Sequence, residues 1–233
     1  MGLIGEGIYE ALRLLLTGDA EVWRVTALSL QVSGTATFVS LLVGIPLGTA
    51  LALARFRGRS LAVSIVNTGM GLPPVVVGLF VTVLLWRSGV FGSLELLYTP
   101  AAMVLAQFVI ATPIVIGLTL AAVQQVPEKF RLQMIGLGAS RAQMIWALLR
   151  EARLPMLAAV MAGFGGVISE VGASMMVGGN IKGSTRVLTT ATVLETSKGN
   201  FDVAIALSVI LLVITFLVNW ALTWIQQQRA RQT

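Results

Sequence analysis

The stretch Pro127–Pro155 reads PEKFRLQMIGLGASRAQMIWALLREARLP and connects two long apolar segments of the chain. Pro127 favours the start of a helix, and Gly138 permits a sharp turn. Ser140 is suited to cap a second helix that runs through Glu151. We therefore predict a helix–glycine–helix projection over residues 127–153, shaped to contact a soluble partner.

The composition around this stretch is that of a membrane protein. Of 233 residues, 56% are hydrophobic and only 11% are charged, whereas soluble domains average about a quarter charged residues. Cysteine and histidine are both absent. Disulfides, thiolate or imidazole metal sites and nucleophile–histidine catalysis are therefore excluded.

Five apolar stretches are long enough to cross a hydrocarbon core of about 30 Å. A shorter segment, Leu3–Leu16, has apolar residues at helical spacing and reads as a helix lying on the membrane surface. We predict one all-α integral membrane domain over residues 1–233, with an N-terminal interfacial helix and five transmembrane helices. The predicted spans are 25–54, 61–85, 99–123, 154–177 and 203–224.

The basic residues predict the orientation of these spans. Ten Lys and Arg residues fall on the side that contains the 127–153 projection, and six fall on the other side. Positive loops face the cytoplasm, so we expect an outside N-terminus and a cytoplasmic C-terminus in the cell (inner) membrane. The net charge of +6 does not indicate nucleic-acid binding, because the cations form short clusters between apolar runs.

Residues that interrupt helices also cluster inside the spans. The segment Gly69–Pro74 contains two glycines and two prolines within six residues of a predicted span. Broken backbone at membrane depth is tolerated only inside protein or beside a cavity. This cluster therefore favours a pathway through the membrane.

The projection resembles a loop found in permease subunits of ATP-binding-cassette importers. Gly138-Ala139-Ser140 is similar to the Gly-Ala-Ser core of that loop, and Leu154-Pro155 to its end. The resemblance implies a type I importer permease whose coupling helix sits in a groove of a separate ATPase subunit. The residues implied to make that contact are Gly138, Ala139, Ser140, Arg141, Glu151 and Arg153.

The loop departs from the family pattern at its start. In that family the loop starts with a glutamate and two alanines, and the corresponding positions here hold Leu132, Gln133 and Met134. The interval from the glycine to Leu-Pro is also about one helical turn longer than usual. An acidic contact with the ATPase has therefore moved, to Glu128 or Glu151, or is lost.

A second resemblance concerns the transported substrate. Residues 168–174 and 178–183 are similar to stretches of molybdate and sulfate permeases, and residues 185–202 resemble tungstate permeases most closely. The likeness covers about residues 25–225. It implies import of an oxyanion, tungstate or molybdate. A permease for sulfate or another small solute, and an ion-coupled secondary transporter, are the alternatives.

Hydroxyl groups could donate hydrogen bonds to a dehydrated oxyanion. The candidates are Ser33, Thr35, Thr37, Ser169 and Ser174. Bonding of each hydroxyl to a carbonyl one turn back is an equally good interpretation. Glu170 would repel an anion, so we predict a structural role for it: pairing with an arginine or capping amides at a break near Gly172.

These features imply an assembly. We expect a homodimer in membrane lipid, with two cytoplasmic ATPase subunits and one external oxyanion-binding protein. The chain contains no Gly-x-x-x-x-Gly-Lys-Ser/Thr loop, so ATP and Mg²⁺ would be bound by the ATPase. We expect neither a cofactor, a metal nor an enzyme activity of its own.

Overall fold

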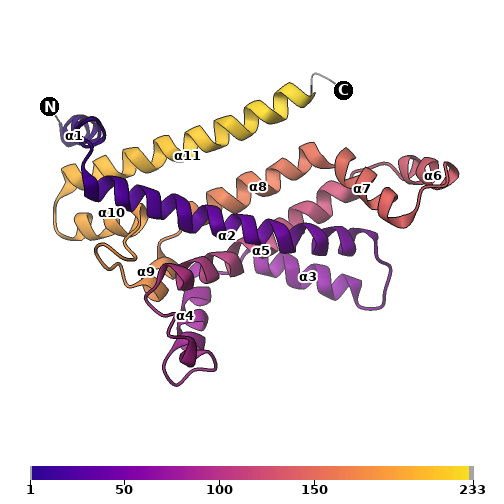
Figure 1. Ribbon diagram of the computed structural model, residues 1–233, viewed down its shortest axis with the longest axis horizontal. Helices are drawn as coiled ribbons and strands as arrows, with labels where there is room; N and C mark the ends of the chain where they lie inside the picture. The colour runs from indigo at the N-terminus through magenta and orange to yellow at the C-terminus, as the bar shows by residue number, and fades with distance from the viewer. Residues whose placement is uncertain (1, 231–233) are drawn as a thin grey trace.

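The computed structural model describes residues 2–230, and every regular element in that range is helical. Three long helices run along the long axis of the molecule: α2 (Ala20–Leu53), α5 (Pro100–Gln124) and α11 (Phe201–Ala230) (Figure 1). They match the first, third and fifth predicted spans. Asp19 begins α2 sharply, because its carboxylate accepts the amides of Glu21 and Val22.

Small residues hold α2 against α5. A Cβ atom built at Gly44 would lie 2.6 Å from Val115 Cγ1, and one built at Gly48 would lie 2.6 Å from the Ile116 carbonyl oxygen. Neither helix could approach so closely with larger side chains at these positions. Gly44 and Gly48 of the first predicted span therefore serve this packing.

The second predicted span is not one continuous helix. It consists of α3 (Arg59–Met70) and α4 (Pro74–Leu85), whose axes differ by 99°. Pro73 and Pro74 cause the break, because neither has an amide hydrogen and each disfavours helical conformation in the residue before it. As a result α4 leaves the bundle direction and projects to one side (Figure 1).

The fourth predicted span is also broken. It is formed by α8 (Arg153–Ile168) and the short α9 (Gly172–Gly178), with Ser169–Val171 between them. The break predicted near Gly172 is therefore present, directly before that residue.

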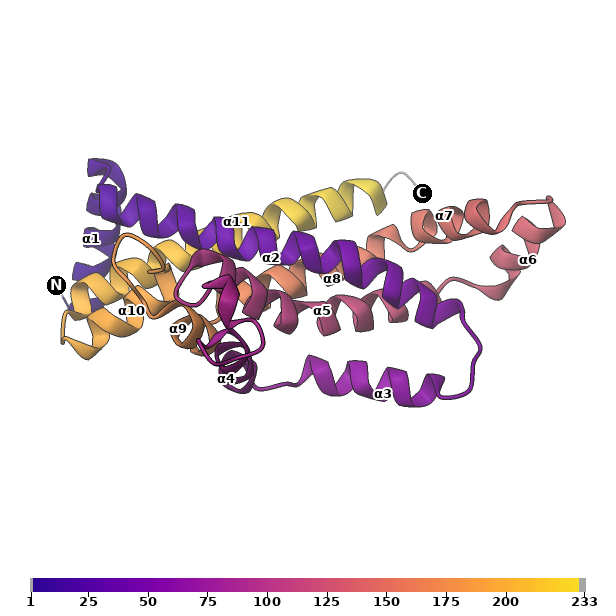
Figure 2. The same ribbon diagram turned by 60° about the horizontal axis from the view of Figure 1, so that its bottom comes forward.

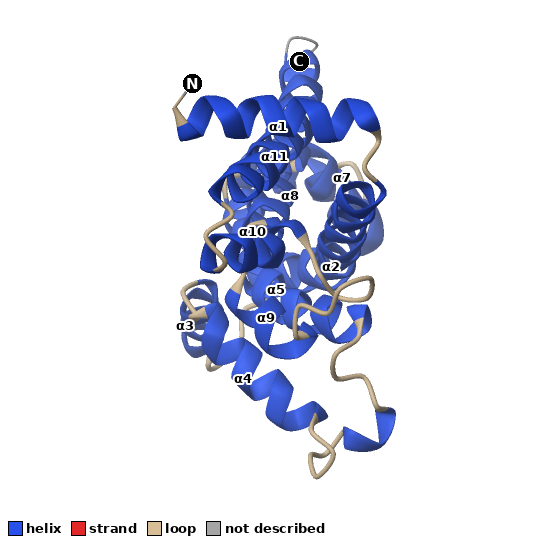
Figure 3. Cartoon of the chain, turned by 90° about the vertical axis from the view of Figure 1, so that its left-hand side faces the viewer, coloured by secondary structure: helices blue, strands red, loops and turns tan. Residues whose placement is uncertain are grey.

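The two ends of the long axis carry different elements. At one end lie α6 (Glu128–Gly136) and α7 (Arg141–Glu151); at the other lie α1 (Leu3–Thr17) and α10 (Leu188–Ser197). Figures 2 and 3 show α1 lying across the ends of α2 and α11. Gly7 makes this crossing possible, since a Cβ there would lie within 2.5 Å of Ile205. The 3₁₀ turn η1 (Gly92–Leu94) lies between α4 and α5.

Three of the described helices, α2, α5 and α11, are each long and apolar enough to cross a membrane. The number rises to five if the bent pairs α3–α4 and α7–α8 are each counted as one span. The fold is thus that of a multi-pass helical membrane protein, as the composition predicts.

Candidate functional site

The two helix breaks lie side by side. A Cβ built at Gly172 would be 2.6 Å from Val75 Cγ2, and one built at Gly78 would be 2.7 Å from Ala173 Cα. The N-terminal parts of α4 and α9 therefore pack closely, with room for no side chain at either glycine. This contact joins the break after Gly71 to the break after Ser169, so irregular backbone from two spans gathers at one place.

Glu170 stabilises the second of these breaks. The residue is only 7% exposed, and its Oε1 accepts the Ala173 amide at 2.6 Å. Its carbonyl oxygen accepts the Thr189 hydroxyl at 3.0 Å, which ties α10 to the same point. The predicted capping of backbone amides is confirmed, and the partner is the amide rather than an arginine.

Three of the five predicted hydroxyl donors lie inside the subunit. Ser33 and Thr37 are buried on α2, where the Thr37 hydroxyl donates to the Ser33 carbonyl at 2.7 Å. Ser174 is buried on α9 and accepts the Gln107 amide at 3.3 Å. The Thr37 and Ser174 hydroxyls are thus hydrogen-bonded within the chain, and all three side chains are covered by its own fold.

Thr35 and Ser169 are exposed. Thr35 lies on the face of α2 away from Ser33 and Thr37. The Ser169 hydroxyl donates to the Gly165 carbonyl at 2.8 Å, which is the local bonding that sequence reasoning could not distinguish from a ligand contact. The structure does not bring the five hydroxyl side chains together in one cluster.

The projecting hairpin has the predicted local structure. Gly138 has φ +75°, a conformation that favours glycine. The Ser140 hydroxyl accepts the Gln143 amide at 3.3 Å, and the Gln143 side chain accepts the Ser140 amide at 2.8 Å. This reciprocal capping box begins α7, so the predicted turn and cap are confirmed.

One buried side chain of the hairpin packs against the rest of the chain, whereas several charged and apolar side chains of the hairpin are exposed. Leu148 is fully buried, whereas Arg141 and Glu151 are exposed and Arg153 is half-buried at the start of α8. The Arg150 guanidinium lies 5.4 Å from the ring centre of Trp146, which is 63% exposed. The exposed apolar side chains of the hairpin are Leu132, Ile135, Leu137, Ile145 and Trp146.

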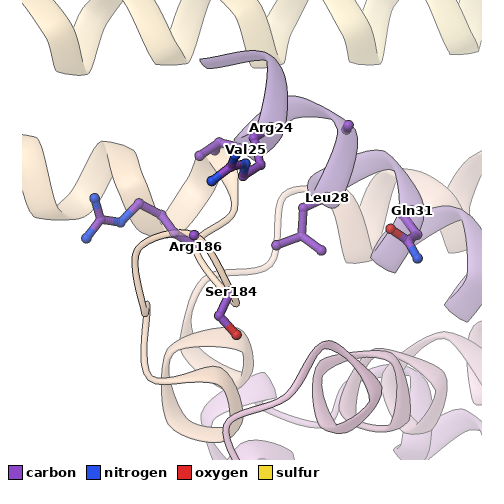
Figure 4. A pocket seen from close by; sticks show the side chains of 8 residues that line it. Arg24, Val25, Leu28, Gln31, Ser184 and Arg186 are labelled. Carbon is purple, nitrogen blue, oxygen red and sulfur yellow. The ribbon is translucent and has the colours of Figure 1, made fainter. Parts of the chain in front are cut away.

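At the opposite end, charged side chains link α2 to the loop before α10. The Glu21 carboxylate lies 2.6 Å from Lys182 Nζ and 3.3 Å from Arg186 Nη1. Beside this cluster is a cavity of about 210 Å³ lined by Arg24, Gln31 and Ser184 among others. Figure 4 shows that the Arg186 guanidinium points away from Ser184 and Gln31.

Known proteins are similar to this chain in sequence and in fold. Residues 44–231 match the family described as "Binding-protein-dependent transport system inner membrane component". A "Probable anion ABC transporter permease protein" of Haloferax volcanii is 43% identical over 84% of this chain and 86% of its own length. The "Tungstate uptake system permease protein TupB" of Peptoclostridium acidaminophilum is 39% identical over 98% of this chain and 100% of its own.

A solved structure supports the same architecture. The inward-facing MetNI methionine ABC transporter has a chain that superposes with a TM-score of 0.71, at 19% identity, covering 90% of this chain and 94% of that one. The helical bundle with its projecting hairpin is therefore a permease fold of the ABC importers. This chain belongs to the family of inner membrane components of binding-protein-dependent transport systems.

Proposed function

We propose that the chain is the membrane subunit of an importer for tungstate, with molybdate as the second substrate. The observation that carries the substrate is the 39% identity to a tungstate uptake permease along the whole of both chains. A probable anion permease at 43% identity points to the same chemical class. The absence of histidine from the sequence fits a neutral donor path whose charge does not change near pH 7.

In the proposed assembly two copies of the chain form a homodimer in the lipid bilayer. The α6–α7 hairpin of each copy faces the cytoplasm and contacts one ATPase subunit, which binds ATP and Mg²⁺ and hydrolyses the nucleotide. The α1–α10 end faces an external oxyanion-binding protein. The chain itself binds no cofactor and carries no ATPase activity.

The proposed coupling step uses the shape of the hairpin. Gly138, Ala139, Ser140, Arg141, Glu151 and Arg153 would form the contact with the ATPase. Closure of the two ATPases on ATP would draw the hairpins together. Since α7 continues into α8 after a bend of 68°, the movement would be transmitted along α8 to the paired breaks.

The test is the tungsten and molybdenum content of cells, measured by mass spectrometry. Cells with and without this chain, each containing the partner subunits, receive nanomolar oxyanion with excess sulfate. We expect a rise in tungsten that depends on the chain and resists sulfate. No rise in either metal, with the chain shown to be in the membrane, would refute the oxyanion assignment but leave the family assignment intact.

A further inference from the structure

Helix α3 presents three different faces. Its packed face meets α5, where a Cβ built at Gly69 would lie 2.8 Å from Pro113 Cβ. A second face carries Leu61 and Ile65, which are 66% and 63% exposed. The third face carries Ser60, Ser64, Asn67 and Thr68, all exposed. We call this third face the polar face of α3.

The spacing of these residues makes the polar face continuous. Positions 60, 64, 67 and 68 follow the i, i+4, i+7, i+8 pattern that places side chains on one side of a helix. The two exposed leucine and isoleucine side chains lie on an adjacent side. Leu61 and Ile65 each lie three positions before a polar-face residue, so the apolar side borders the polar face directly.

The depth of the polar face makes contact with lipid unfavourable. Asn67 comes eight residues after Arg59, which begins α3 beside the basic loop residues Arg55 and Arg57. At 1.5 Å per residue it lies about 12 Å along the helix from that end. This places the carboxamide well inside a hydrocarbon core of about 30 Å, where an amide without a partner is strongly destabilising.

The polar face leads to exposed irregular backbone. Gly71, Leu72 and Pro73, which separate α3 from α4, are all exposed in the chain. Non-helical backbone at membrane depth occurs where other protein or a water-filled cavity covers it. Side-chain polarity and backbone irregularity, two independent features, therefore indicate that the C-terminal half of α3 and the linker after it are covered by water or protein rather than by lipid.

We propose that the polar face of α3 lines the water-filled transport path, and that Asn67 donates hydrogen bonds to the passing oxyanion. The part of this proposal that assigns Asn67 to an oxyanion rests on the proposed function, whereas the part that places α3 beside a water-filled path does not. A carboxamide offers two N–H donors without a fixed positive charge, which suits an anion that must leave again. The Thr68 hydroxyl is already bonded to the Ser64 carbonyl at 2.9 Å, so Asn67 is the stronger donor.

The absence of cysteine from the chain allows a direct test of the path. Ser64→Cys and Asn67→Cys are compared with Leu61→Cys and Ile65→Cys, each as the single cysteine of the chain in the complete transporter. Membranes are treated with a charged thiol reagent with and without a non-hydrolysable ATP analogue, and modification of this chain is followed by mass spectrometry. Only a thiol in water ionises readily and reacts.

We expect the two polar-face cysteines to react at least about tenfold faster than the two controls in one nucleotide state or the other. Equal and slow reaction of all four positions in both states would overturn the proposal. That result would place the polar face against protein, for example a second copy of the chain. Because no oxyanion is used, the outcome is independent of the substrate assignment.

The donor role of Asn67 is tested by uptake. Asn67→Leu is expected to lower oxyanion uptake at subsaturating concentration at least about tenfold, which corresponds to losing one charge-assisted hydrogen bond. Asn67→Gln is expected to restore part of it, and Ile65→Val, on the adjacent apolar side of α3, to have no effect. Full uptake by Asn67→Leu, at equal amounts in the membrane, would overturn the donor role even if the cysteines react.

Discussion

Glu170 is the residue on which the α8–α9 break depends. Its buried carboxylate accepts the Ala173 amide, so Glu170→Gln should retain an acceptor and Glu170→Leu should leave the amide unsatisfied. We expect the leucine variant to lose about 1–3 kcal/mol of stability and the glutamine variant less. The measurement is the midpoint of thermal unfolding in detergent. Equal midpoints for all three proteins would show that the cap contributes nothing.

Glu195, at the α1–α10 end, gives a residue-scale prediction for pH. Hydrogen bonds from Asn200 and then from Lys198 hold the pKa of this carboxyl below its ordinary value of 4.5. A lowered pKa in the folded state means that the contribution to stability is complete above 4.5 and is lost as the pH falls through the folded pKa.

The wild-type chain should therefore be more stable than Glu195→Gln at about pH 7, and this advantage should shrink as the pH falls below 4.5. Thermal unfolding midpoints of both proteins across this range provide the measurement. The expected difference is small, because the Lys198 partner is half exposed. An advantage that grows in acid would contradict the assigned direction of the pKa shift.

Sequence reasoning succeeded at the residue scale where the relevant partner is close along the chain. The Ser140 cap, the Gly138 turn and the Glu170 cap each involve residues no more than three positions apart. It could not decide which hydroxyls face a pathway. Ser33 and Thr35 look alike in sequence, yet one is buried against the bundle and the other is exposed.

At the scale of elements, the α6–α7 hairpin has a specific weak point at Gly138. Its φ of +75° is accessible to glycine, and its amide donates to the Ile135 carbonyl at 2.9 Å. Proline cannot adopt this positive φ, and it has no amide hydrogen to donate. We expect Gly138→Pro to abolish uptake while the chain still inserts in the membrane and the ATPase subunits still hydrolyse ATP.

Gly136→Ala is the matched control for this prediction. Gly136 ends α6, and a Cβ added there would meet nothing within 4 Å, so its uptake should equal that of the wild type. Uptake and ATP hydrolysis are measured together in reconstituted complexes. Normal uptake by Gly138→Pro would remove the hairpin from the coupling mechanism.

The elements also show what a linear sequence cannot specify. The Gly69–Pro74 cluster predicts an interruption, and the structure contains one. The direction that α4 takes afterwards is set by its contact with α9, through Gly78 and Gly172. That contact joins residues almost 100 positions apart, so local propensity carries no information about it. The polar face of α3, in contrast, could have been found from its helical spacing alone.

The whole molecule exposes large apolar side chains along α4 and α11. Val76, Leu79, Phe80 and Val83 on α4 are between 38% and 63% exposed. Lipid or a second copy of the chain must cover such surfaces. The length and composition of α2, α5 and α11 make lipid the partner of these long helices. Helix α4 projects sideways from the bundle (Figure 1), so its exposed side chains can be covered by another subunit of the transporter as well as by lipid.

Orientation in the membrane is a property of the whole molecule, and the unequal distribution of basic residues predicts it. The loop between α2 and α3, which carries Arg55 and Arg57, lies at the same end of the molecule as the hairpin (Figure 1), so the more basic loops gather at one end. Loops rich in Lys and Arg face the cytoplasm, and this rule depends on the number of basic residues rather than on net charge. We therefore expect the hairpin in the cytoplasm and the α1–α10 end outside.

Single cysteines in the otherwise cysteine-free chain test this orientation. Ala142→Cys on the hairpin and Ser184→Cys before α10 are both at exposed positions. Since a membrane-impermeant reagent reaches only water on its own side, intact spheroplasts should label Ser184→Cys at once and Ala142→Cys only after permeabilisation. The reverse order would invert the topology and place the hairpin on the side without ATP, which would also rule out its proposed contact with the ATPase.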